Sequence, residues 1–161
     1  MLSQKARYAL RALYALAAKP AGTPIMIAEI AAEARVPRKF LEQILLDLKR
    51  RGIVHSRRGK LGGYALAKSP DKISFADIIR TIDGPLALSP CVSVTAYRRC
   101  SDCTDEATCV TRRVLLAVRD ATAGILERRT LAEALPAMGT KKSRRRAGSA
   151  TGSPAVRVPQ Q

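Results

Sequence analysis

Apolar residues recur at helical spacing in three stretches of the first 50 residues. The second stretch spans residues 27–34, and a turn at residues 35–37 separates it from the third. The first stretch predicts a helix that Ser3 can cap, with an apolar face made of Ala6, Ala9, Leu10, Leu13, Leu16 and Ala17. The third stretch predicts a helix between Pro37 and Gly52, with an apolar face made of Phe40, Leu41, Ile44, Leu45 and Leu48. A short helix, a turn and a longer helix are typical of a helix-turn-helix, and also of a helical hairpin in any small α domain.

The residues that follow favour the helix-turn-helix. Residues 52–57 and 64–67 are short β-prone runs, and residues 58–63 between them are basic and rich in glycine. This pattern predicts a β-hairpin with a cationic tip. A hairpin directly after a helix-turn-helix is a winged helix, in which the recognition helix enters the major groove and the wing meets phosphates or the neighbouring minor groove. The predicted fold is therefore mostly α with a small β-wing.

The pattern changes after the wing. A short helix capped by Ser74 is expected to end at Gly84, a loop then reaches residue 108, and a long amphipathic helix covers residues 109–128 before a short one at 130–135. No apolar periodicity remains after Met138, which predicts disorder. We therefore expect four segments. They are a winged helix-turn-helix at 1–84, a cysteine-bearing loop at 85–108, a dimerisation helix with a short terminal helix at 109–136, and a basic tail at 137–161.

Charge sharpens this picture. The chain carries 29 Lys and Arg against 13 Asp and Glu, for a net charge of +16. The excess lies in residues 1–70 and in the tail, while residues 71–138 are balanced. Such a distribution favours a polyanionic partner over a protein-interaction adaptor. Aromatic residues make up only 4%, too few for a protein that stacks single-stranded bases.

The four cysteines are the strongest local signal for chemistry. Cys91, Cys100, Cys103 and Cys109 lie within 19 residues in a polar, arginine-rich stretch. Four thiolates can hold a tetrahedral ion or an iron–sulfur cluster. The single C-x2-C step favours a cluster over zinc, whose sites usually contain two such pairs. A set of free or disulfide-switching thiols is a further alternative.

Other classes of function have little support. The chain has one histidine, and its one glycine-rich basic stretch lies between two strands, so neither a hydrolytic triad nor a phosphate-binding loop is predicted. We expect no enzyme. No apolar run is long enough to span a bilayer, and a folded first helix is preferred to a transit peptide, which predicts a cytoplasmic protein without a membrane partner.

These stretches resemble the IscR/NsrR-type winged-helix transcriptional regulators of bacteria over residues 1–136. The most specific matches are FLEQIL in the third helix and RRGKLGGY in the wing. The resemblance implies a homodimer, paired through the helix at 109–128, that binds double-stranded DNA. It assigns DNA contacts to Arg38, Lys39, Glu42 and Gln43 in the recognition helix and to Arg58 in the wing. Arg57 and Lys60 are basic residues of the same wing, and we expect them to contact DNA as well.

Glu42 has two interpretations, because it can accept a hydrogen bond from cytosine or pair with Arg38 or Lys39 along the helix. The resemblance also implies that cysteines before the long helix hold iron. Cys103 and Cys109 keep the family's six-residue step, Cys91 lies further upstream than usual, and Cys100 is additional. The expected cofactor is an iron–sulfur cluster of the [2Fe–2S] type, with zinc as the alternative. The expected function is a transcriptional regulator that senses iron–sulfur, nitric oxide or redox status. The alternative is a DNA-binding regulator or architectural protein with structural zinc or a thiol switch.

Overall fold

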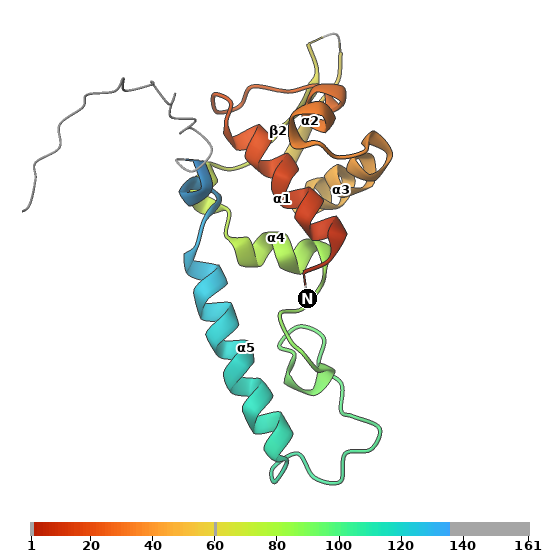
Figure 1. Ribbon diagram of the computed structural model, residues 1–161, viewed down its shortest axis with the longest axis vertical. Helices are drawn as coiled ribbons and strands as arrows, with labels where there is room; N and C mark the ends of the chain where they lie inside the picture. The colour runs from red at the N-terminus through yellow and green to blue at the C-terminus, as the bar shows by residue number, and fades with distance from the viewer. Residues whose placement is uncertain (1, 60, 136–161) are drawn as a thin grey trace, which may run out of the picture.

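The computed structural model describes residues 2–59 and 61–135 (Figure 1). Lys60 and the predicted tail at 137–161 lie outside the described residues. The α-helices are α1 (Gln4–Ala17), α2 (Ile27–Ala34), α3 (Arg38–Arg50), α4 (Phe75–Ile82) and α5 (Val110–Arg128). The strands are β1 (Val54–Arg57) and β2 (Gly63–Leu66), and the short 3₁₀ turns are η1 (Pro70–Lys72), η2 (Pro90–Val92) and η3 (Leu131–Ala134). The predicted mostly α fold with a small β-wing is confirmed.

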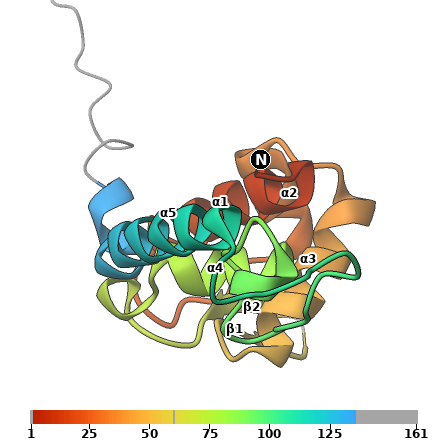
Figure 2. The ribbon, with the colours of Figure 1, turned by 90° about the horizontal axis from the view of Figure 1, so that it is seen from below.

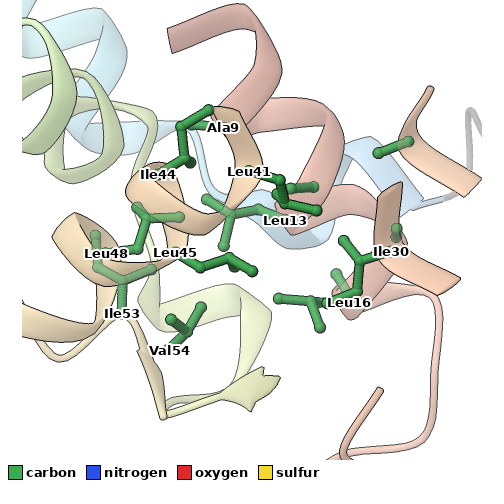
Figure 3. Packing of buried hydrophobic residues seen from close by; sticks show 14 of the residues in the cluster. Ala9, Leu13, Leu16, Ile30, Leu41, Ile44, Leu45, Leu48, Ile53 and Val54 are labelled. Carbon is green, nitrogen blue, oxygen red and sulfur yellow. The ribbon is translucent and has the colours of Figure 1, made fainter. Parts of the chain in front are cut away.

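The core forms where α1, α2 and α3 meet, because each of these helices presents one apolar face to the others. Leu13 and Leu16 of α1 lie beside Ile30 of α2 and Leu41 and Leu45 of α3 (Figure 3). All five side chains are almost fully buried. Burying a side chain of this size stabilises the folded state by about 1.5–3 kcal/mol. Because the five side chains come from three helices, their packing fixes the orientation of α3 relative to α1 and α2.

Phe40 is an exception to the predicted buried face of α3. Its side chain is 62% exposed, and its ring meets Tyr8 of α1 edge-to-face at a centroid distance of 6.3 Å. The buried stripe begins one residue later, at Leu41. Phe40 lies in the first turn of α3, where the Tyr8 ring covers only part of its surface. The prediction that Phe40 belongs to the core is therefore wrong.

Polar contacts fix both ends of α1. The Ser3 hydroxyl accepts a hydrogen bond from Ala6 N at 3.0 Å, as predicted for a cap, and Ser3 N donates to Asp83 Oδ2 at 2.9 Å just after α4. Lys5 Nζ lies 2.7 Å from Asp47 Oδ2 of α3. This hydrogen bond from Lys5 is the main reason why the pKa of Asp47 lies below its ordinary value. The ion pair joins α1 to the C-terminal half of α3.

The wing is an antiparallel hairpin in which Val54 pairs with Leu66 and Arg57 with Gly63. Ile25 extends this sheet by one residue, since its N–H and C=O both bond Tyr64, at 2.9 and 2.8 Å. Gly63 has φ +149°, and a Cβ there would lie 2.3 Å from the Ile25 carbonyl oxygen. A glycine is needed at this position because the Ile25 backbone approaches so closely.

Helix α5 lies beside α4, on the other side of the head from α2 and α3 (Figure 2). Its C-terminal end is attached to the head, because Leu131 is fully buried and Leu131 N donates to Ile73 O at 2.9 Å. Arg80 of α4 also donates to Glu127 of α5 at 2.5 Å. None of the 19 residues of α5 is buried. Among the helices of the described residues, none has both the length and the apolar character that a membrane span requires.

Two adjacent leucines of α3 test this description of the core. Leu45 is fully buried, whereas Leu46 is 40% exposed. We expect Leu45→Ala to lower the free energy of unfolding by about 2–5 kcal/mol, through lost burial and the cavity that remains. Leu46→Ala is the matched control, and we expect it to cost less than about 1 kcal/mol. Urea denaturation followed by circular dichroism measures both values, and equal losses would contradict this packing.

Candidate nucleic-acid interface and cysteine segment

The four side chains predicted to face DNA from α3 are all exposed. Arg38 Nε lies 3.3 Å from Glu42 Oε1, an ion pair between successive turns of the helix. Gln43 Nε2 donates to Asp47 Oδ1 at 3.1 Å, which draws its side chain along α3 toward the Lys5 contact. Of the two interpretations of Glu42, the intrahelical pair is the one present in the free protein. Exposed pairs of this kind are weak, so the same groups remain available to another partner.

Arg57 and Arg58 lie at the end of β1, where the chain enters the tip of the wing, and both are exposed. Lys60, the third cation predicted for the wing, is outside the described residues. The tip turns tightly, because Gly62 N donates to Gly59 O at 2.9 Å and a Cβ on Gly62 would lie 2.3 Å from Arg57 O. The hairpin projects from the same head that carries α3 (Figure 1). The described residues thus present the cations of α3 and of the wing on exposed surface.

The cysteines fall into two parts. Cys91 is buried in η2, and Cys100 is half-buried after a stretch of exposed loop. The Ser89 hydroxyl lies 3.3 Å from Cys91 Sγ and 4.0 Å from Cys100 Sγ. A hydrogen bond with Cys91 raises the pKa of the Cys100 thiol above its ordinary value, while the Ser89 hydroxyl lowers it by less. Ser89, Cys91 and Cys100 therefore form one small cluster.

Cys103 and Cys109 have different surroundings. Cys109 is the N-cap of α5, and its Sγ accepts a hydrogen bond from Arg112 N at 3.4 Å. Arg99 Nη2 donates to the carbonyl oxygens of Cys103 and Thr104, both at 3.0 Å. Cys103 therefore contacts the Arg99 side chain through its backbone, whereas Cys109 contacts the first turn of α5 through its sulfur.

Arg112 stands three residues after Cys109, and its Nε is buried. This atom lacks a hydrogen-bond partner within the described residues, and its nearest carboxylate oxygen, Glu106 Oε2, is 3.7 Å away. The Glu106 carboxylate is the anionic group beside this guanidinium, so Arg112 does not require a further anion. By their chemistry alone, the four thiols of this stretch fit a metal centre.

The placement of the thiols does not. In the part of the chain that the structure describes, no three Cys, His, Asp or Glu side chains converge as metal ligands. Cys91 and Cys100 are brought together, and Cys103 and Cys109 are not brought to them. A tetrahedral zinc or a [2Fe–2S] cluster needs four ligands. As arranged here, the four cysteines do not fit either group.

Arg119 of α5 is a further connection that the sequence does not reveal. Its Nη1 donates to Val92 O at 2.8 Å, and its Nη2 contacts Asp120 Oδ1 at 2.6 Å. The bond to Val92 ties the segment that carries Cys91 to the middle of α5. Arg119 and Val92 are 27 residues apart, so local spacing contains no signal of their contact.

Known proteins share this architecture. The chain is 46% identical over 121 residues to an rrf2-like HTH-type transcriptional regulator of Rhodobacter capsulatus, covering 73% of this chain and 81% of the relative. The structure of CymR, the global cysteine regulator of B. subtilis, superposes with a TM-score of 0.68 at 31% identity, covering 85% of this chain and 97% of CymR. T. potens IscR has the same TM-score at 28% identity, covering 89% of this chain and 91% of IscR.

A family model also matches most of the chain. The Rrf2 model, described as an iron-dependent transcriptional regulator, matches residues 2–137. These relatives are transcriptional regulators and not enzymes, and the structural neighbours include the IscR-type proteins that the sequence resembles. With a winged helix, exposed cations on α3 and the wing, and a family match over most of its length, this chain belongs to the Rrf2 family of DNA-binding transcriptional regulators.

Proposed function

We propose that the protein binds a specific, roughly palindromic DNA site as a homodimer and regulates transcription there. The observation that carries this proposal is the pairing of an exposed polar face on α3 with an exposed arginine-bearing wing, on a head whose first 70 residues have a net charge of +10. In this proposal residues 1–84 bind DNA, residues 85–108 sense a signal, and residues 109–136 form the dimer contact.

Each predicted side chain has a distinct task in this mechanism. Arg38 and Lys39, in the first turn of α3, reach base edges and phosphates as the helix enters the major groove. Glu42 and Gln43 lie one turn further along and can exchange their present partners for base edges. Arg57, Arg58 and Lys60 carry the wing's positive charge to the adjacent backbone or minor groove.

The dimer contact is proposed on the apolar stripe of α5. Val110, Val114, Val118 and Ile125 are 64%, 57%, 40% and 56% exposed. Steps of four and seven residues place them along one face of the helix. An amphipathic helix of 19 residues without a buried side chain is stabilised when a second copy covers this face.

The wing arginine provides the first test of DNA binding. We expect Arg58→Ala to weaken binding to a selected operator by about 1–3 kcal/mol if Arg58 reads a groove. Its melting temperature should stay that of the wild type, because Arg58 is exposed. Fluorescence anisotropy at fixed salt measures the affinity. Arg128→Ala, which removes an equal charge from the C-terminal end of α5 and not from the wing, is the control, and equal affinity losses in both variants would refute the role of Arg58.

The dimer stripe has its own matched pair. We expect Val114→Glu to weaken self-association at least about tenfold, because a carboxylate would be buried against the partner helix. Arg113→Glu places the same side chain about 100° around the helix and should leave the dimer intact. Light scattering with size-exclusion chromatography gives the mass of each variant. A dimeric Val114→Glu protein would show that another surface joins the subunits.

For the sensing step, we propose a second function: Cys91 and Cys100 form a thiol–disulfide switch. The Ser89 hydroxyl lies 3.3 Å from Cys91 Sγ and 4.0 Å from Cys100 Sγ, and this shared neighbour supports a pair. A peroxide serves as the two-electron oxidant. One thiolate attacks its O–O bond to give a sulfenic acid, and the other thiol displaces water to form the disulfide. Two thiols and one hydrogen peroxide thus give one disulfide and two waters.

Arg119 offers a path from this pair to the dimer helix. A disulfide shortens the separation of Cys91 and Cys100, and this change strains the backbone of η2. The Val92 carbonyl, next to Cys91, is held by Arg119 of α5 at 2.8 Å. Movement of η2 therefore acts on the helix that sets the spacing between the two DNA-binding heads.

Purification without oxygen separates the switch from the metal alternatives. We expect colourless protein without stoichiometric iron or zinc, and a Cys91–Cys100 disulfide after one equivalent of hydrogen peroxide. Peptide mass spectrometry identifies the linkage, and Cys100→Ser removes it. Cys103→Ser is the matched control and should keep it. Brown protein containing iron and sulfide would overturn the switch and support the cluster suggested by the family description. Stoichiometric zinc would support a structural site.

A further inference from the structure

A cavity of about 510 Å³ lies where the head, α4 and the cysteine-bearing segment meet. Its lining comes from several places along the chain. Arg51 follows α3, Lys68 follows β2, and Lys72 ends η1, while Asp77 and Arg80 belong to α4. Thr95 and Ala96, between Cys91 and Cys100, complete the wall. The volume falls within the range of about 300–1,000 Å³ that is typical of small-molecule sites.

The charges around this cavity are unbalanced. Four cationic side chains line it against one carboxylate, that of Asp77. Asp77 is already engaged, because it accepts a hydrogen bond from the Ser74 hydroxyl at 2.8 Å in the cap of α4. Arg80 is neutralised by Glu127 at 2.5 Å.

The remaining cations, Arg51, Lys68 and Lys72, make no ion pair within the described residues. Three like charges around one cavity repel each other, and an anion bound between them removes that cost.

Apolar side chains also line the cavity. Ile53 and Ile73 are nearly fully buried in the head, and Pro85 adds further apolar surface. Thr95 offers a hydroxyl, whereas the Thr81 hydroxyl already donates to Asp77 O at 2.7 Å. A cavity lined by both apolar groups and cations suits a molecule with an apolar body and a negatively charged end.

We propose that this cavity is a binding site for a small organic anion. The ligand would carry a phosphate or carboxylate group at one end and have an apolar body. Its charged end would contact Arg51, Lys68 and Lys72, and its body would cover Ile53 and Ile73. The ligand would contact both the end of the recognition helix and the segment between Cys91 and Cys100. Binding of the anion does not depend on the proposed function in transcription, so an experiment can contradict one proposal without contradicting the other.

Isothermal titration calorimetry of the full chain with phenyl phosphate tests the proposal. Phenyl phosphate combines both features, inorganic phosphate carries the charge alone, and phenol carries the ring alone. We expect phenyl phosphate to bind more tightly than either. Lys68→Gln combined with Lys72→Gln should weaken its binding by about tenfold or more. Arg51→Gln, on a different element, should weaken it in the same direction.

Arg7→Gln combined with Arg11→Gln is the matched control, because it removes two exposed charges from α1, outside the cavity. We expect it to leave the affinity for phenyl phosphate unchanged. Equal losses in the two double variants would mean diffuse attraction to a basic protein and would overturn the site. Equal binding of inorganic phosphate and phenyl phosphate would overturn the apolar contact.

DNA is the competing anion, and a separate measurement distinguishes it. Without phenyl phosphate, the double lysine variant should bind an operator duplex as the wild type does. If it loses as much DNA affinity as Arg58→Ala, these lysines contact DNA phosphates, and the small-molecule site is refuted. Should no operator be bound by any variant, the proposed function fails while the calorimetry still decides the site.

Discussion

The packing of α1 against α3 is the constraint on which the DNA-binding surface depends. Leu13 of α1 and Leu41 and Leu45 of α3 are fully buried against each other, and the Lys5–Asp47 ion pair closes one side of this contact. Because the buried stripe fixes the rotation of α3 about its axis, it also fixes which residues face outward. Arg38 and Lys39 are exposed for the same reason that Leu41 is buried. The recognition surface is therefore a consequence of the core.

Different contacts hold helix α5 in place. Its C-terminal end is joined to the head through the buried Leu131 and the Arg80–Glu127 pair, and its middle is joined to the cysteine segment through Arg119. Its N-terminal end begins at Cys109, whose sulfur caps the helix. A change in the cysteine segment can therefore act on α5 both at its N-terminus and through Arg119. Its apolar stripe needs a partner for stability, so the same helix joins the subunits and receives signals from the cysteine segment in the proposed mechanism.

Local sequence patterns predicted the head well, because its information is local. Apolar spacing predicted α1 and α3, Ser3 and Ser74 were predicted to cap α1 and α4, and the glycine-rich stretch predicted the wing. The prediction that Phe40 is buried was wrong because apolar spacing along α3 does not show how far α1 covers it. Contacts between distant residues were inaccessible. The approach of Cys91 to Cys100, the burial of Cys91 and the Arg119–Val92 bond all depend on how a segment without regular structure folds back onto α5.

The cysteine segment links the proposed thiol switch, the proposed dimer helix and the proposed anion site. Cys91 and Cys100 lie within it, Val92 contacts α5, and Thr95 and Ala96 line the basic cavity below the end of α3. A segment with few buried side chains has little stability of its own, so modest binding or covalent changes can shift its conformation. Redox chemistry and a bound anion would then act on the same element. Their effects on DNA binding should therefore be coupled, since each changes the cost of the other.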